Sequence, residues 1–317
     1  MRVGSVVGRS GLDGRWWPAP AKLNLFLQIV GRRPDGYHLL QTIFQIIELC
    51  DKLRFDLTDD GVIRRIDDET SSPPAGVAPE QDLCVRAARA LQAAIGRRHH
   101  GVEIRLRKRI PLGGGLGGGS SDAATTLLVL NALWEGGLDT DQLVNIGAQL
   151  GADVPVFIRG QSAWAEGVGE RLTPLPLPQR WFLVIHPGVA VPTAAVFQAP
   201  ELTRNSPVIT IPAPLCPAGR NDCEPVVRSR FPAVAAALDW LAAFAPAKLT
   251  GTGACVFAEF ETSAAAERIA AQVPECWRAW VARGLQSSPL QPLLAAAGES
   301  CVAGEAACPG RGQGPGR

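Results

Sequence analysis

The stretch from residue 111 to residue 126, PLGGGLGGGSSDAATT, places six glycines and two serines between a strand-like segment and a helical one. Because glycine has no Cβ, such a loop can turn through positive φ and bring several backbone N–H groups close to an anion. We expect the following helix to begin near Ser120 or Ser121, either of which could cap it, with its positive dipole end facing the same anion. The stretch therefore predicts a cradle for phosphate.

Other interpretations of the glycine run fit less well. Gly113, Gly115 and Gly118 satisfy the dinucleotide pattern GxGxxG, with Asp139 at the spacing of a ribose-binding acid, but a run this rich in glycine satisfies almost any glycine pattern. A Walker A loop needs a lysine directly after its last glycine, whereas glycine and serine follow Gly118. A flexible linker is not usually flanked by an alternating strand pattern before it and leucines at helical core spacing after it.

Length and composition bound the class of protein. A chain of 317 residues exceeds the usual single domain, so we expect an N-terminal domain over residues 16–170 and a C-terminal domain over 171–297, with disordered tails at 1–15 and 298–317. The formal net charge of +1 gives no electrostatic case for nucleic acid or an anionic membrane. Any polyanion that the protein binds is therefore expected to be small.

The cysteines and the lack of export signals predict a location. The eight cysteines include no CxxC pair and no accompanying histidine cluster, which favours reduced thiols over a zinc site. No signal peptide is convincing, and no apolar run approaches the roughly 18 residues that a membrane span needs. We therefore expect a cytoplasmic protein.

Hydrophobic periodicity outlines the elements around these motifs. Extended patterns at 22–30 and 39–55 flank a turn at 32–36, and the segment at 249–260 has glycines before an alternating strand. Helical spacing is found at residues 82–95, 121–135, 140–150 and 232–244.

Two motifs carry candidate catalytic groups. In PAKLNLFL, Lys22 and Asn24 would share one face of a strand, which suits an anionic or polar ligand, although a solvent-facing edge strand explains them equally well. In LGADVPVF, Asp153 can cap a short helix whose first turn contains Pro155, or it can act as a general base. Phosphoryl transfer needs positioning, charge neutralisation and a carboxylate that accepts the proton of the attacking hydroxyl. Asp153 paired with Lys22 would suit that task.

Two further motifs each allow two interpretations. Tyr37 is the only tyrosine of the chain, and with His38 it could stack on and read a heterocycle, or it could be a packed ring of a β-turn. The GTG triplet at 251–253 is either a tight turn before a strand or a second backbone contact to phosphate.

Taken in order, five segments resemble the GHMP kinase superfamily over about residues 16–293: PAKLNLFLQIVGRRPDGYHLLQT, KRIPLGGGLGGGSSDAAT, LGADVPVF, HPGVAVPTAAVF and LTGTGACVFAEF. The glycine loop and the GTG segment are shared in outline across this superfamily, which includes galactokinase, homoserine kinase and mevalonate kinase. PAKLNL, GYH and PTAAVF resemble the branch that phosphorylates a diphosphocytidyl alcohol. The resemblance implies an α+β fold in which an N-terminal domain like the second domain of ribosomal protein S5 meets a ferredoxin-like C-terminal domain at the active cleft.

The resemblance also implies an activity, which is ATP-dependent phosphorylation of the 2-hydroxyl of 4-diphosphocytidyl-2-C-methyl-D-erythritol in non-mevalonate isoprenoid synthesis. Mg²⁺ would accompany ATP, without an assignable protein ligand. Lys22 and Asp153 match the catalytic pair. Tyr37 and Phe197 match rings that sandwich cytosine, while His38 matches the residue that hydrogen-bonds the edge of the base.

The remaining implied contacts concern ATP and the middle of the substrate. Asn24 would contact the erythritol or phosphate portion. Lys108 and Asp82 fall near the adenine end, and Asp82 is a departure because relatives can carry Asn there. The implied phosphate loop consists of Pro111, Leu112, Gly113, Gly114, Gly115, Leu116, Gly117, Gly118, Gly119, Ser120 and Ser121.

Two alternatives stay open at this point. One is a GHMP kinase for another alcohol, such as homoserine or mevalonate. The other is a non-catalytic nucleotide-binding or RNA-binding protein that keeps an S5-like domain.

Overall fold

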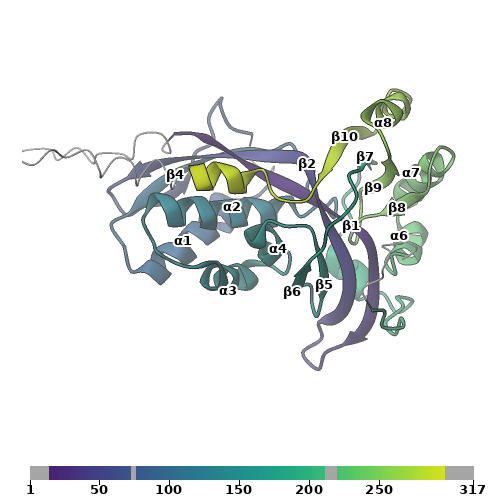
Figure 1. Ribbon diagram of the computed structural model, residues 1–317, viewed down its shortest axis with the longest axis horizontal. Helices are drawn as coiled ribbons and strands as arrows, with labels where there is room; N and C mark the ends of the chain where they lie inside the picture. The colour runs from purple at the N-terminus through teal and green to yellow at the C-terminus, as the bar shows by residue number, and fades with distance from the viewer. Residues whose placement is uncertain (1–13, 73–75, 211–219, 297–317) are drawn as a thin grey trace, which may run out of the picture.

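The computed structural model describes residues 14–72, 76–210 and 220–296 (Figure 1). The predicted tails therefore lie outside the described residues, apart from residues 14 and 15. The strands form one mixed sheet in the order β3-β4-β2-β10-β7-β9-β8, with β1 and β5 paired to β2 and β6 paired to β5. The strands are β1 (Trp16–Arg32), β2 (His38–Thr58), β3 (Ile63–Arg65), β4 (Gly101–Arg107), β5 (Ala163–Glu166), β6 (Arg171–Pro174), β7 (Trp181–His186), β8 (Ala247–Leu249), β9 (Val256–Phe260) and β10 (Arg278–Leu285).

The antiparallel hairpin of β1 and β2 confirms the two extended segments and the turn expected between them. Both strands are longer than the patterns suggested, and the register shifts between Asn24 and Leu27. Trp17 near the start of β1 packs in one hydrophobic core, whereas Leu27 and Ile29 near its end pack in a second. The hairpin thus connects the two halves of the molecule.

Four helices cover one face of the sheet in the N-terminal half (Figure 1). They are α1 (Leu83–Ile95), α2 (Gly118–Leu133), α3 (Thr140–Leu150) and α4 (Val154–Arg159), and a short 3₁₀ turn, η1 (Pro79–Gln81), precedes α1. The helical periodicity at 82–95 and 140–150 is confirmed. Asp82 caps α1, and Asp139 forms a capping box with Gln142 at the start of α3, so the acid that matched a ribose-binding position is used by the fold.

The C-terminal half has its own core beneath β7, β9 and β10. Its helices are α5 (Thr193–Phe197), α6 (Glu224–Arg230), α7 (Pro232–Ala242) and α8 (Ser263–Ala270), and α7 confirms the helix expected at 232–244. After β10 the chain returns to the first half, where Leu290 is buried in the first core with Leu293 and Leu294 packed against it. The boundary expected near residue 170 stays a prediction. Among the described helices, none is long and apolar enough to cross a membrane.

Candidate active site

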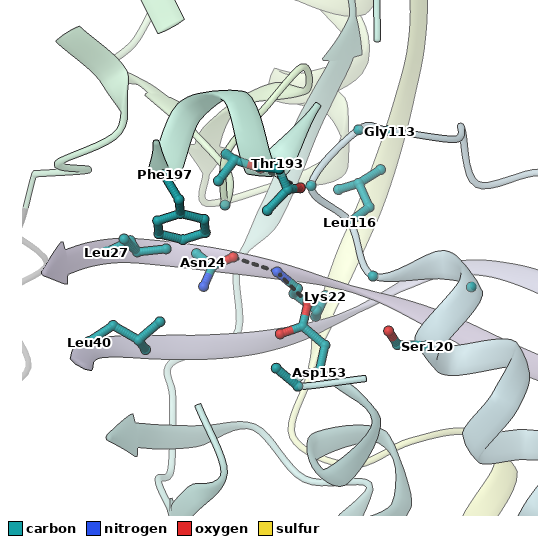
Figure 2. A pocket seen from close by; sticks show the side chains of 18 of the residues that line it. Lys22, Asn24, Leu27, Leu40, Gly113, Leu116, Ser120, Asp153, Thr193 and Phe197 are labelled. Carbon is teal, nitrogen blue, oxygen red and sulfur yellow. Dashed lines mark hydrogen bonds and ion pairs between the residues drawn. The ribbon is translucent and has the colours of Figure 1, made fainter. Parts of the chain in front are cut away.

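A cleft of about 860 Å³ lies where β1, the glycine-rich loop, the start of α4 and α5 come together (Figure 2). Most of the residues that the sequence analysis singled out line this cleft, although they come from segments far apart in the chain. They are Lys22, Asn24, Tyr37, His38, Lys108, Pro111, Leu112, Gly113, Gly114, Gly115, Leu116, Gly117, Gly118, Gly119, Ser120, Asp153 and Phe197. Asp82 and Ser121 are buried and are not among the residues that line the cleft.

The glycine loop needs glycine at two of its turns. Gly115 and Gly117 have φ angles of 73° and 70°, which L side chains rarely adopt. A Cβ on Gly115 would lie 2.2 Å from the carbonyl oxygen of Thr250, and one on Gly117 would lie 2.9 Å from the Phe157 ring. The loop can therefore approach both the GTG segment and α4 only because these positions carry no side chain.

The helix expected at 121–135 is present as α2, but the prediction that Ser120 or Ser121 caps it was wrong. The helix begins at Gly118 with Gly117 as its N-cap, because the positive φ of Gly117 lets the chain enter the helix at once. Gly117 has no side chain to cap the first turn, so the N–H groups there are left for a ligand or water. Ser121 is buried inside the helix packing, and its hydroxyl makes no hydrogen bond among the described residues.

The GTG segment supports the glycine loop from the other half of the molecule. The N–H groups of Ala254 and Cys255 donate to the carbonyls of Gly113 and Gly114 at 2.9 and 3.1 Å. The N–H of Gly253 donates to the carbonyl of Thr250 at 2.9 Å, so the segment is also a tight turn before β9. The turn interpretation is confirmed, and the second phosphate contact stays a prediction.

Lys22 and Asp153 face each other across the cleft (Figure 2). Lys22 is only 3% exposed, and its Nζ lies 3.4 Å from Oδ2 of Asp153. Asp153 occupies the N-cap position of α4, with Pro155 in the first turn, but its side chain makes no capping hydrogen bond. The helix-start interpretation was therefore correct for the backbone, while the carboxylate is left for Lys22 and for a ligand.

Asn24 is buried beside Lys22, so the expectation that this face of the strand points to solvent was wrong, although β1 pairs with β2 alone among the named strands. The Lys22 ammonium donates to Oδ1 of Asn24 at 2.5 Å, and Nδ2 of Asn24 donates to Oγ1 of Thr42 at 2.9 Å. The backbone N–H of Asn24 donates to Oγ1 of Thr250 at 3.0 Å. These bonds fix the amide with its oxygen toward the lysine, and they fix the lysine in turn.

Lys108 is held beneath the first turn of α2. Its ammonium donates to Oδ2 of Asp122 at 2.7 Å and also to the carboxylate of Asp51. Burial alone would lower the pKa of Lys108, but the two carboxylates outweigh it and raise that pKa, so the side chain is a cation. Burial raises the pKa of the Asp122 carboxyl. The Lys108 charge is thus largely balanced by the protein itself.

Asp82 has a complete structural role outside the cleft. Its side chain accepts from the N–H of Cys84 at 2.8 Å and pairs with Nη1 of Arg65 at 2.8 Å. Both side chains are 4% exposed. A contact between Asp82 and the adenine end of ATP stays a prediction, and these bonds account for the residue without one.

An aromatic corner closes the far end of the cleft. The His38 ring stacks on Phe197 with centroids 5.0 Å apart and an interplanar angle of 21°. Tyr37 lines the rim with 62% of its surface exposed, so the packed-ring alternative was wrong. Burial lowers the pKa of His38, and the positive charges of Arg204 and Arg32 add to that effect.

Sequence reasoning missed several residues of the site. Thr193 lines the cleft from α5, and its hydroxyl lies 3.0 Å from that of Thr252. Thr193 lies in the PTAAVF motif, in which only Phe197 was assigned a contact with the substrate. Thr250 lies in the segment LTGTGACVFAEF, of which only the GTG triplet was given a role, and its contacts with Asn24 and Gly115 are long-range. Arg204 also acts through a long-range contact, and no local pattern points to it.

Comparisons with known proteins show the family of this chain. The family descriptions "GHMP kinases N terminal domain" and "GHMP kinases C terminal" match residues 82–161 and 213–279. The 4-diphosphocytidyl-2-C-methyl-D-erythritol kinase of Alkalilimnicola ehrlichii is 56% identical over 276 residues, covering 87% of this chain and 93% of the relative. A crystal structure of 4-(cytidine 5'-diphospho)-2C-methyl-D-erythritol kinase is 35% identical with a TM-score of 0.73, covering 85% of this chain and 99% of the other. A crystal structure of mevalonate kinase has a TM-score of 0.63 at 15% identity, covering 86% of this chain and all of the other, which shows likeness of fold alone.

Proposed function

Since this chain belongs to the 4-diphosphocytidyl-2-C-methyl-D-erythritol kinase family of the GHMP kinases, we propose a role in the reaction for each group in its cleft. The protein is an ATP-dependent kinase of the methylerythritol phosphate route to isoprenoid precursors. It phosphorylates the 2-hydroxyl of 4-diphosphocytidyl-2-C-methyl-D-erythritol, giving the 2-phosphate and ADP. The expected fold class, α+β with N- and C-terminal domains, is confirmed.

The pairing of Lys22 with Asp153 beside the glycine loop carries the mechanistic proposal. Asp153 accepts the proton of the 2-hydroxyl as its oxygen attacks the γ-phosphorus, and the bond from that phosphorus to the bridging oxygen of ADP breaks. Lys22 pairs with that carboxylate, because its Nζ lies 3.4 Å from Oδ2 of Asp153. It also offsets negative charge on the transferring phosphoryl group.

The phosphates of ATP are proposed to lie against the glycine loop and the first turn of α2. The support is geometric, because an uncapped helix start follows a loop whose backbone turns through positive φ. Ser120 lines the cleft from the first turn of α2 and can add a hydroxyl donor. Asn24 holds Lys22 and faces the erythritol or phosphate portion of the substrate.

The aromatic corner is proposed to bind cytosine. Phe197 offers a stacking surface, and His38 offers ring nitrogens that can hydrogen-bond the edge of a base. Tyr37 at the rim would cover the outer face of the base, which accounts for a large aromatic ring left exposed in the free protein. Homoserine and mevalonate carry no base for these three residues to bind.

Mg²⁺ is proposed to enter with ATP, held mainly by phosphate oxygens and water. No group of three or more carboxylate, histidine or cysteine side chains that could hold a metal occurs in the described parts of the chain. Mg²⁺ usually keeps several waters and binds through one or two carboxylates and substrate phosphates rather than in an all-protein cage. A cytoplasmic location is likewise proposed, and it agrees with the free thiols of Cys84, Cys223 and Cys255.

A substrate panel tests this function. The purified protein is incubated with ATP, Mg²⁺ and either the cytidyl alcohol, homoserine or mevalonate, while ADP release and the ³¹P spectrum of the product are recorded. We expect ADP release with the cytidyl alcohol to exceed that with the others by at least about 100-fold, since buried polar groups left unpaired by the wrong substrate are costly. Comparable rates with all three alcohols would contradict the assignment.

A further inference from the structure

Arg204 lies in the loop after α5, and its guanidinium joins the two groups proposed to bind the base. Its Nε donates to Nε2 of His38 at 3.2 Å. Its Nη2 donates to the carbonyls of Phe197 and Ala199 at 3.0 and 2.7 Å, and its Nη1 donates to the carbonyl of Leu202 at 3.0 Å. One side chain therefore ties the imidazole to the end of the helix that carries the stacking ring.

The hydrogen bond to the imidazole fixes the protonation of that ring. A guanidinium has only donors and stays charged in proteins, so Nε2 of His38 must be the acceptor. A neutral imidazole has one acceptor nitrogen and one N–H, and the proton of His38 is therefore on Nδ1. The charged groups that face this ring, Arg204 and Arg32, are both positive, which also favours the neutral form.

We propose that Arg204 is a positioning residue for base recognition. It holds His38 as the neutral tautomer with a proton on Nδ1, and it sets the distance between that donor and the ring of Phe197. A ring nitrogen or carbonyl acceptor of the base would then meet a donor that is already oriented. The inference rests on the proposed function, in which these two residues bind cytosine.

A nearby arginine provides a matched control. Arg230 forms a bidentate pair with Glu201 at 2.7 and 2.9 Å and reaches the carbonyl of Ala195 on α5 at 3.5 Å. It therefore resembles Arg204 in charge and in its attachment to α5, but its contacts do not include the imidazole. Arg230→Met tests what loss of a cation near α5 does by itself.

The test compares Arg204→Met, His38→Ala and the double variant in the full-length enzyme. We expect Arg204→Met to raise KM for the cytidyl alcohol about 10-fold while kcat and KM for ATP change by less than about 2-fold, the pattern of a lost binding contact. Arg230→Met should leave all three constants within about 2-fold. The fold increase in KM of the double variant should be well below the product of the fold increases in the two single variants. Substitutions within one hydrogen-bonded network do not have additive free-energy effects.

The ¹⁵N chemical shifts of the imidazoles report the tautomer of His38. That tautomer would not change in Arg204→Met if Arg204 had a purely structural role. The chain has only four histidines, and the His38→Ala variant assigns the signal. The wild-type ring should show a protonated Nδ1, and Arg204→Met should shift it to a mixture of tautomers. An unchanged tautomer, an unchanged KM in Arg204→Met, or fully additive effects in the double variant would each overturn the inference.

The same set of variants separates this inference from the proposed function. If His38→Ala leaves KM for the cytidyl alcohol unchanged, the cytosine site itself is misplaced. If His38→Ala raises that KM and Arg204→Met does not, the cytosine site stands and only the role of Arg204 is overturned.

Discussion

Lys22 is a buried cation, and its surroundings account for how it is tolerated. Its ammonium contacts Asn24, lies near Asp153 and sits 5.2 Å from the centroid of the Phe44 ring. Burying a charge is costly unless it is paired and hydrogen-bonded, and here both conditions are met. The side chain is therefore fixed in place before any substrate arrives, which is what electrostatic stabilisation of a transition state requires.

At Phe197 the prediction concerns stacking. Phe197→Ala should remove base stacking worth about 1 to 3 kcal/mol and raise KM for the cytidyl alcohol by roughly 5- to 150-fold, with KM for ATP unchanged. Steady-state kinetics with both substrates varied would measure this. Phe244→Ala is the control, because that ring is 42% exposed and outside the cleft lining. An unchanged KM for the cytidyl alcohol in Phe197→Ala would refute the stacking role.

At His38 the prediction concerns pH. Burial and the charges of Arg204 and Arg32 lower the pKa of this imidazole below its ordinary 6.5, so the neutral form persists as the pH falls through 6.5. KM for the cytidyl alcohol should be flat from pH 8 to about 6.5 and rise only at lower pH, where the imidazolium can no longer accept from Arg204. His38→Ala should lack this rise. A KM that climbs between pH 7.5 and 6.5 would contradict the lowered pKa.

At the scale of elements, the glycine loop and the first turn of α2 act as one unit whose shape depends on contacts from elsewhere. The hydroxyl of Thr250 donates to the carbonyl of Gly115 at 3.3 Å across 135 positions of sequence, and the N–H of Lys22 donates to the carbonyl of Leu116 at 3.0 Å. Strand β1 and the GTG segment therefore hold the loop from both sides.

A substitution at Gly117 tests whether the shape of the glycine loop matters for activity. Gly117→Ala places a Cβ at positive φ, 2.9 Å from the Phe157 ring and 3.3 Å from Cε of Lys22, and shifts of about 1 Å at such a site can cost 100-fold in rate. We expect kcat/KM to fall by at least about 30-fold. Gly137→Ala is the matched control, since Gly137 has a φ of 68° with open space around it. Both variants share the backbone strain, so equal activities would contradict the proposed role of the loop.

Local periodicity predicted the elements better than their ends. The helix at 82–95 and the strands at 22–30 and 39–55 were found because apolar spacing is a local property. The start of α2 was misplaced because a glycine at positive φ, rather than a serine cap, opens the helix. The shared face of Lys22 and Asn24 followed from the period of a strand, but their burial did not, because the covering segments lie far along the chain.

The cleft residues also differ in whether the local sequence reveals them. Residues in compact motifs, such as Asp153 and His38, could be proposed from sequence and resemblance. Arg204 could not, because its role arises only when a loop after α5 folds back on the start of β2.

For the whole molecule, the chain passes more than once between two of its hydrophobic cores, and the cleft is lined by residues of both. The β1–β2 hairpin runs from the first core to the second, and the helical turn at residues 290–296 returns to the first (Figure 1). The groups proposed to bind ATP and those proposed to bind the base thus lie in a molecule whose halves are joined by parts of the chain from both ends.

The returning segment supplies a stability prediction. Leu290 is 2% exposed in the first core, so Leu290→Ala should reduce the free energy of unfolding by about 2 to 5 kcal/mol through lost burial and a residual cavity. Urea denaturation would measure it. Val208→Ala is the control, because that side chain is 70% exposed and its loss should change stability by less than about 0.5 kcal/mol. Similar small effects in both variants would mean that the returning segment contributes little.

The rate of phosphoryl transfer within the ternary complex of Asp153→Asn tests the central claim most directly. The dissociation constant for ATP is measured first, and the exposed Asp141→Asn serves as a control for loss of one surface carboxylate. We predict ATP affinity within about 3-fold of the wild-type value and single-turnover transfer slower by at least about 100-fold, the range that a general base contributes. Transfer at close to the wild-type rate, with ATP bound normally, would contradict the account.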